Sequence, residues 1–278
     1  MTRLSLHPFE TFDQQVKTAG RSQVLIRLSY RGAPFYGVPP QPGLPSVTGA
    51  LQEQMTRTFG QPLKALTFTA RTDKGVDADV NFATGWLKTG PSIPSTGLRI
   101  ESSQGGLGEL EIAPVPQDVF ARTISLSKTY TYRFRDNFLA GSREGVAYWD
   151  IHPKLDIELM QEAAQHITGN HNFESFQVRP GKKPTNTNCT VLSGCIKRCD
   201  TAEGSQIIFQ VCGESFLRRM VRTLAGTLAE IGCGLMPPSA MKELLENPNP
   251  MWIGPTAPAR GLKLTHIELK KNLLHLFD

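Results

Sequence analysis

The chain has 278 residues, 39% of them hydrophobic and 20% charged, which is an ordinary composition for a globular protein. Its 30 Lys and Arg residues exceed its 25 Asp and Glu residues by five, so the charge permits a polyanionic partner without requiring one. No apolar run approaches the ~18 residues of a membrane-spanning helix, and the mostly polar residues 1–22 lack the apolar core of a secretory signal peptide.

The first half of the chain predicts several strands and one helix. Residues 23–30 alternate apolar and polar side chains, which is typical of a strand. An apolar residue at every fourth position from 47 to 59 predicts a helix that begins near Ser46 and ends at Gly60. Further strands are expected at residues 63–68, 80–87 and 109–115.

Residues 90–108 are rich in Gly, Ser and Pro and predict a loop or a degenerate helix. The run from Gly105 to Gly108 resembles a phosphate-binding loop. No strand followed by a helix frames this run, so a flexible loop is the favoured interpretation over a nucleotide site.

The second half is expected to start near Pro116. Residues 157–168 predict a helix capped by Asp156 and ended by Gly169, and residues 216–231 give the clearest helical pattern of the chain, closed by Gly232. Strands are expected at 128–135 and 262–269, a hairpin at 190–198 and 206–211, and a short helix at 239–246. The chain therefore reads as a tail (1–22) and two α+β halves (23–115 and 116–278) with largely antiparallel sheets.

The most informative motif is Arg-Thr-Asp-Lys-Gly-Val at residues 71–76. An Asp in a glycine-containing turn is ordinary turn chemistry. The functional alternative is that Asp73 is a nucleophile kept ionised by the neighbouring cations Arg71 and Lys74. Arg71 would share a strand face with Asp73 if the preceding strand continued that far.

Two basic clusters are candidates for contact with phosphates. The predicted helix 216–231 carries Arg218, Arg219 and Arg222, which either coat a solvent-facing surface or face phosphates or a carboxylate. The loop with Arg179, Lys182 and Lys183 is either a solvated loop or, beside that helix, a track for an RNA backbone.

Tyr130 is either a core tyrosine or a residue that stacks on a base or moves a proton. The five cysteines form no CxxC pair, which favours reduced thiols in an intracellular compartment. Cys189, Cys195 and Cys199 are evenly spaced and would share one face of a regular strand, where zinc is conceivable but small buried thiols are favoured. No metal constellation and no Ser/His/Asp constellation is predicted.

Five ordered segments resemble the TruA family of tRNA pseudouridine synthases, and the resemblance spans residues 24–269. The segments are residues 70–76, 118–122, 127–133, 167–176 and 215–222, with a weaker match at 257–262. The resemblance implies two α+β halves of ferredoxin-like origin around a central cleft. It also implies a cofactor-free, cytoplasmic homodimer (or a mitochondrial one) that isomerises uridine to pseudouridine in the anticodon stem-loop of tRNA, around positions 38–40.

By the same resemblance Asp73 is the catalytic aspartate and Arg71 its neighbour in the motif. Tyr130 is the active-site tyrosine, Arg222 pairs with the aspartate, and Leu262 lines the base pocket. The candidate RNA-binding residues are Lys74, Lys128 and the members of the two basic clusters, Arg218, Arg219, Arg179, Lys182 and Lys183.

Several positions depart from the family pattern. The family's Gly-Trp-Gln appears here as Gly37-Val38-Pro39, and Asp77 replaces the usual His and adds a negative charge near the active site. The family's Arg-Thr before the late hairpin reads Asn186-Thr187, and residues 90–108 have no clear counterpart. These departures lie in substrate-handling regions, so a non-catalytic RNA-binding protein with the same fold is the alternative hypothesis.

Overall fold

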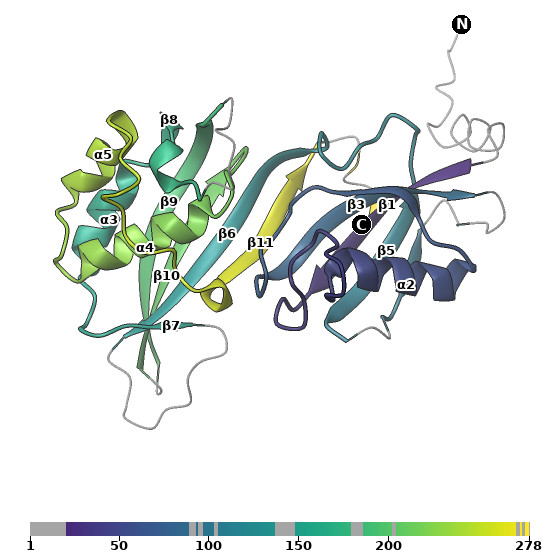
Figure 1. The fold of residues 1–278 in the computed structure, drawn as a ribbon, viewed down its shortest axis with the longest axis horizontal. Helices are drawn as coiled ribbons and strands as arrows, with labels where there is room; N and C mark the ends of the chain where they lie inside the picture. The colour runs from purple at the N-terminus through teal and green to yellow at the C-terminus, as the bar shows by residue number, and fades with distance from the viewer. Residues whose placement is uncertain are drawn as a thin grey trace, which may run out of the picture. The chain divides into compact units, whose positions relative to one another are not determined.

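The computed structural model describes residues 21–88, 93, 97–102, 105–136, 148–178, 186–201, 204–270, 273 and 276–277 (Figure 1). The chain divides into two compact units. Unit 1 falls within Met1–Leu126 and Ile267–Asp278, and unit 2 within Ser127–His266. The first expected strand begins at Arg21, and the rest of the expected tail lies outside the described residues.

Unit 1 is built on an antiparallel sheet with the strand order β4-β5-β1-β3, to which β2 adds by pairing with β3. The sequence predicted four of these strands, although β1 and β3 bury consecutive residues and thus both of their faces over much of their length. The strands are β1 (Arg21–Tyr30), β2 (Lys64–Phe68), β3 (Asp77–Lys88), β4 (Leu98–Ile100) and β5 (Leu107–Pro114).

The helix α2 (Val47–Phe59) in unit 1 confirms both predicted ends. The Ser46 hydroxyl accepts a hydrogen bond from the Gly49 N–H at 3.0 Å, which is the ordinary N-cap contact. Gly60 closes the helix in the left-handed conformation (φ 69°). Val47, Leu51 and Met55 form the buried stripe of this helix.

The region expected to be a loop or degenerate helix contains a short strand, β4, which pairs with β5. The run at residues 105–108 is partly strand, since β5 begins at Leu107, and β5 leads into turns rather than into a helix. Gly106 has φ 95°, and a Cβ there would lie 2.8 Å from the Phe35 ring. The run is therefore packed against residues 34–35 and is no phosphate cradle.

Unit 2 has the strand order β11-β6-β10-β9-β8, with β7 parallel to β6. The expected α+β class with mainly antiparallel sheets is thus confirmed in each unit. The helices α3, α4 and α5 group beside β8, β9 and β10 in Figure 1. The elements are β6 (Ser125–Asp136), β7 (Trp149–Asp150), α3 (Ile157–Gln165), β8 (Gly169–Asn172), β9 (Asn188–Thr201), β10 (Gly204–Gly213), α4 (Met220–Gly232), α5 (Ser239–Glu246) and β11 (Leu262–Leu269). The described part of this unit also contains two 3-10 turns, η1 (Glu174–Phe176) and η2 (Ala259–Gly261).

Two predicted helix bounds were wrong. The helix α4 begins at Met220 rather than at residue 216, because Arg219 has a left-handed backbone (φ 62°) that interrupts any helix before it. Arg218 and Arg222 therefore do not lie on one helical face. The helix α3 is capped by Asp156 as expected but ends at Gln165, and Gly169 starts β8 instead of closing the helix.

The prediction that three cysteines share one strand face was also wrong. The pairing of β9 with β10 shifts by one residue between Val191 and Ser193, which is a bulge at Leu192. The bulge places Cys189 on the opposite face from Cys195 and Cys199, because side chains alternate and one extra residue reverses the alternation.

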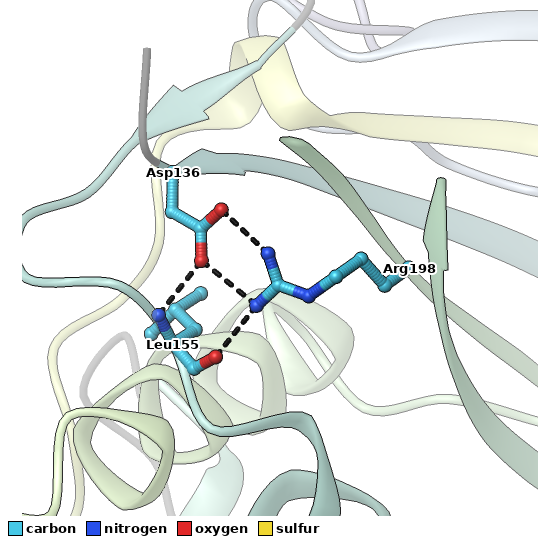
Figure 2. Close-up of polar contacts among 3 residues, drawn as sticks. All are labelled: Asp136, Leu155 and Arg198. Atoms are coloured by element: carbon cyan, nitrogen blue, oxygen red, sulfur yellow. Dashed lines mark hydrogen bonds and ion pairs between the residues drawn. The ribbon is translucent and has the colours of Figure 1, made fainter. Parts of the chain in front are cut away.

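The interior of unit 2 contains a buried ion pair that sequence patterns did not predict (Figure 2). The guanidinium of Arg198 on β9 binds both carboxylate oxygens of Asp136 at the end of β6, at 2.8 and 2.9 Å. The same carboxylate accepts the Leu155 N–H at 2.7 Å, and Arg198 donates to the Leu155 carbonyl. Asp136 has no exposed surface, so this two-pronged contact satisfies a fully desolvated charge.

No helix in the described part of the chain is both long enough and apolar enough to cross a membrane.

Candidate active site

The Arg-Thr-Asp-Lys-Gly-Val motif forms a tight turn between β2 and β3. The Val76 N–H donates to the Asp73 carbonyl at 3.2 Å, and Gly75 has φ 79°, which is the left-handed third position of a type II turn. Asp73 is half-buried, whereas Arg71 and Lys74 are exposed. Because β2 already ends at Phe68, the condition for Arg71 to share a strand face with Asp73 is not met.

A buried polar network lies directly beneath this turn. The side chain of Thr72, which precedes Asp73, hydrogen-bonds to the Tyr30 hydroxyl at 2.9 Å. Asn81 on β3 donates to that hydroxyl at 3.1 Å and to the Ala70 carbonyl at 2.9 Å, and its oxygen accepts the Ala70 N–H at 3.2 Å. Burial raises the pKa of Tyr30 to about 12, so the phenol stays neutral and keeps its proton for hydrogen bonding.

A loop from residue 31 to residue 38 covers the backbone of the same turn. The Val38 N–H donates to the Thr72 carbonyl at 3.2 Å. Gly37 has φ 101°, and a Cβ on it would lie 3.0 Å from that carbonyl, so this departure from the family element keeps the glycine that the contact needs. The Lys74 ammonium sits 3.7 Å from the centre of the Tyr36 ring, as a cation–π contact.

Asp77 has a structural partner that the sequence did not indicate. Its carboxylate accepts the backbone N–H of Gly32 at 2.7 Å, within the same loop. The negative charge predicted from the family departure is therefore held in a charge-assisted hydrogen bond.

Tyr130 lies on β6 in unit 2 and is 9% exposed. Its ring packs edge-on against Phe216, with ring centres 5.2 Å apart. Tyr132, two residues further along the same strand face, is fully buried and donates to the Pro258 carbonyl at 2.8 Å. Burial raises the pKa of Tyr132, and the positive charges of Arg222 and Arg260 oppose that rise only in part.

Arg222 is fixed on α4 by the chain segment before β11. Its Nε donates to the Ala257 carbonyl at 2.7 Å, and the Ala257 N–H donates back to the Arg222 carbonyl at 3.1 Å. The segment approaches α4 very closely, since a Cβ on Gly226 would overlap the Pro255 carbonyl oxygen. The Gly254 N–H also donates to the Thr227 hydroxyl at 3.2 Å.

The remaining predicted residues are buried or half-buried, exposed, or outside the described part of the chain. Lys128 is half-buried, burial lowers its pKa, and it donates to the Glu214 carbonyl at 3.4 Å. Leu262 is buried at the start of β11, Arg218 is exposed, and Arg219 is half-buried at the start of α4. Arg179, Lys182 and Lys183 lie outside the described residues.

The predicted site residues thus belong to two separate sets. Arg71, Asp73 and Lys74 share one turn of unit 1, whereas the other described candidates belong to unit 2. Sequence reasoning missed Tyr30 and Asn81, which are a strand tyrosine and a strand asparagine without any local motif. The sequence marked Asp77 as a departure from the family pattern but did not indicate its hydrogen bond to Gly32. No group of three or more potential metal ligands occurs among the residues that the structure describes.

Comparison with known proteins adds independent information. Residues 163–269 match the family model described as tRNA pseudouridine synthase. The chain is 32% identical to "tRNA pseudouridine synthase A" of Methylacidiphilum infernorum, over 87% of this chain and 94% of that protein. It is 31% identical to mouse "tRNA pseudouridine synthase-like 1", over 89% and 94%, and 29% identical to the Myxococcus xanthus "tRNA pseudouridine synthase A", over 87% and 90%.

Similarity to solved structures is weaker. A chain of the crystal structure of a Cbf5-Nop10-Gar1 complex matches with a TM-score of 0.35 and 12% identity, over 94% of this chain and 51% of that chain, which is too low to compare the folds. The sequence relatives decide the assignment, because their similarity extends over nearly the whole of both chains. This chain belongs to the tRNA pseudouridine synthase family.

Proposed function

We propose that this protein is an isomerase that converts uridine to pseudouridine in tRNA, with Asp73 as the essential residue. The observation that carries the proposal is that Asp73 lies in a turn whose backbone is hydrogen-bonded or packed on both sides. The relatives that match this chain over most of their length are named tRNA pseudouridine synthase. A rigid turn suits a catalytic carboxylate, because catalysis depends on holding the reacting group in place.

The chemistry matches the residue types. The N1–C1′ bond of uridine breaks, the uracil rotates, and a C5–C1′ bond forms while the C5 proton is lost and N1 gains one. Substrate and product are isomers, so no redox carrier or energy source is consumed. An anionic Asp73 starts the reaction either by covalent attack or by removing a sugar proton to give a glycal, and both routes use the same side chain.

The residues of unit 2 are assigned to the same reaction by the family resemblance. A base inside a helix cannot present C1′ to a carboxylate, so the nucleotide is flipped out of the stack. Tyr130 contacts the flipped base, Leu262 lines its pocket, and Arg222 orients the aspartate. Ala257 supports this role of Arg222, since its carbonyl already holds the guanidinium on one side.

Exposed cations supply the RNA contacts. Arg71, Lys74 and Arg218 are exposed, and Lys128 and Arg219 are half-buried. Contacts of this kind bind phosphates and give a salt-dependent affinity. We assign the anticodon stem-loop of tRNA as the target, a homodimer as the active form and the cytoplasm as the compartment. Light scattering of the purified protein tests the dimer.

The deciding experiment measures pseudouridine on unmodified tRNA transcripts with wild-type protein and the Asp73→Asn variant. Carbodiimide-dependent reverse-transcription stops map the modified positions. We expect the wild type to form pseudouridine and the variant to lose it by at least about 1,000-fold, because the substitution keeps the size of the side chain but removes the nucleophile.

The matched control is Asp79→Asn, which removes an exposed carboxylate from β3 of the same unit. This control should keep activity, and filter binding should show that Asp73→Asn still binds tRNA. Substantial turnover by Asp73→Asn would refute the proposed mechanism. Tight tRNA binding without any product from the wild type would instead favour a non-catalytic RNA-binding protein.

A further inference from the structure

We propose that Asp77 is a positioning residue for Asp73 and that it acts through Gly32 and the loop at residues 31–38. The inference rests on the proposed function, because it assigns a role in the reaction of Asp73. Asp77 itself touches neither the substrate nor the reacting atoms in this assignment. What it supplies is a hydrogen-bond acceptor that holds the loop against the catalytic turn.

The side chain of Asp77 contacts the backbone of Gly32. Asp77 is the first residue of β3 and follows the turn directly. Its carboxylate oxygen accepts the Gly32 N–H at 2.7 Å, in a partly buried setting where a charge-assisted hydrogen bond is strong.

The backbone of Gly32 also lies against the turn that carries Asp73. A Cβ built on Gly32 would lie 2.4 Å from both the nitrogen and the oxygen of Val76, and 2.5 Å from the carbonyl carbon of Gly75. The two backbones are therefore in direct contact, without room for any side chain. A displacement of Gly32 must displace Val76 or open a gap beneath it.

The loop binds the other end of the turn as well. The Val38 N–H donates to the Thr72 carbonyl, and Gly37 lies against the backbone of residues 72–74. Thr72 and Val76 flank the three residues Asp73, Lys74 and Gly75. The loop thus holds both ends of the segment that carries the carboxylate.

The loop is itself anchored to two other elements of unit 1. The Arg31 N–H donates to the Gly106 carbonyl at 2.8 Å, next to β5. The Gly37 carbonyl accepts the Val47 N–H at 3.1 Å, at the start of α2. Because these anchors are part of the folded unit, the Asp77–Gly32 bond connects the catalytic turn to a fixed support.

The hydrogen-bond acceptor and the negative charge of Asp77 are expected to affect catalysis by Asp73 in opposite directions. The acceptor fixes Gly32, whereas the charge is carried four residues along the chain from Asp73, whose carboxylate must itself be anionic. Asparagine keeps an acceptor oxygen and removes the charge, and alanine removes both. The pair of variants therefore separates positioning from electrostatics.

The experiment compares Asp77→Ala and Asp77→Asn with the wild type by steady-state kinetics on tRNA. We expect kcat of Asp77→Ala to fall about 10- to 100-fold with KM within about threefold, because small misplacement of a reacting group slows the chemical step. Asp77→Asn should stay within about threefold of the wild-type kcat, since its amide oxygen still accepts the Gly32 N–H.

Amide hydrogen exchange gives a second readout that does not depend on activity. In 15N-labelled Asp77→Ala, the Gly32 and Val76 amides should exchange at least about tenfold faster than in the wild type, because their hydrogen bonds open more often. In Asp77→Asn they should stay protected. If Asp77→Ala does not fold, Gly32→Ala tests the same contact from the other side and should lower kcat with KM retained.

Three results would overturn the inference: a wild-type kcat for Asp77→Ala, an equal loss of kcat in both Asp77 variants, or unchanged exchange of Gly32 and Val76 in Asp77→Ala. An inactive wild type would refute the proposed function alone. The exchange measurement would then still decide whether Asp77 holds the turn.

Discussion

The two units bury polar groups in different chemical forms. Beneath the Asp73 turn, unit 1 buries a neutral network of Tyr30, Thr72 and Asn81, and the phenol at its centre keeps its proton because burial raises its pKa. Unit 2 buries a charged pair, Asp136 with Arg198, in which each ion depends on the other. Loss of one hydrogen bond in a neutral network costs about 1–3 kcal/mol, and a phenol within it makes stability depend on high pH. Loss of one partner of a buried ion pair costs more, about 3–5 kcal/mol.

The largest expected effect is the loss of Arg198. The Arg198→Met variant should reduce the free energy of unfolding of unit 2 by about 3–5 kcal/mol, because it leaves the Asp136 carboxylate buried without its counter-charge. Urea denaturation, followed by hydrogen exchange of peptides from each unit, measures the loss.

The matched control for that variant is Arg27→Met in unit 1. Arg27 also contacts a carboxylate, Glu111, at 2.8 Å, but 45% of its side chain is exposed. Water and Arg99, whose guanidinium contacts the same carboxylate at 2.9 Å, replace this partner, so the control should cost only about 0–1 kcal/mol. Equal losses in the two variants would contradict the contrast between buried and exposed ion pairs.

The next effect is a loss of stability of unit 1 at high pH. The pKa of Tyr30 is about 12 in the folded protein against 10.0 ordinarily, so between these values the unfolded chain releases the proton and the folded chain keeps it. The stabilisation is complete below pH 10 and is lost as pH rises toward 12, by up to about 3 kcal/mol for a change of two pH units.

Denaturant unfolding of unit 1 at several pH values on both sides of pH 10 tests this expectation. Tyr30→Phe is the control, because it removes the titrating group while the lysines and other tyrosines still titrate. The two curves should converge as pH rises. Parallel curves would show that the proton of Tyr30 does not contribute.

The smallest expected effect is the loss of a helix N-cap, and it should be equally large in both units. Ser46 caps α2 in unit 1 and Asp156 caps α3 in unit 2, by accepting N–H groups at 3.0 and 3.1 Å. Ser46→Ala and Asp156→Ala should each cost about 1 kcal/mol of unfolding free energy in their own unit. Thermal unfolding detects both, and a loss confined to one unit would mean that one cap is redundant.

Local patterns predicted the elements whose cause is local. The presence of β1, the apolar residue at every fourth position of α2 and the residues at both ends of that helix are properties of short windows, and they were confirmed. The alternation within β1 was not, since Val24, Leu25 and Ile26 are all buried. The late start of α4 was missed for the same reason. Its apolar spacing continues back to Phe216, but that ring packs against Tyr130, far away in the sequence, and Arg219 takes a left-handed backbone.

Partners that lie far apart in the sequence were beyond such reasoning. Asp136 and Arg198 are separated by 62 residues, and Asp77 and Gly32 by 45. Neither pair has a motif, since a single aspartate or glycine in a window is compatible with many roles. Asp73 could be proposed as the reactive carboxylate because six consecutive residues carry the motif, whereas Tyr30 and Asn81, which lie beneath its turn, are dispersed over two strands.

The last strand has a consequence for synthesis of the protein. β11 starts in unit 2 and continues into unit 1, where the Lys270 N–H donates to the Ile124 carbonyl and the Phe277 ring lies 5.8 Å from that of Phe82. On the ribosome, residues 21–126 therefore emerge before residues 267–278, which belong to the same unit. The core of unit 1 can be completed only after all of unit 2 has been translated. During that interval unit 1 exposes apolar surface, so nascent chains stalled before residue 267 are the species that we expect chaperones to bind.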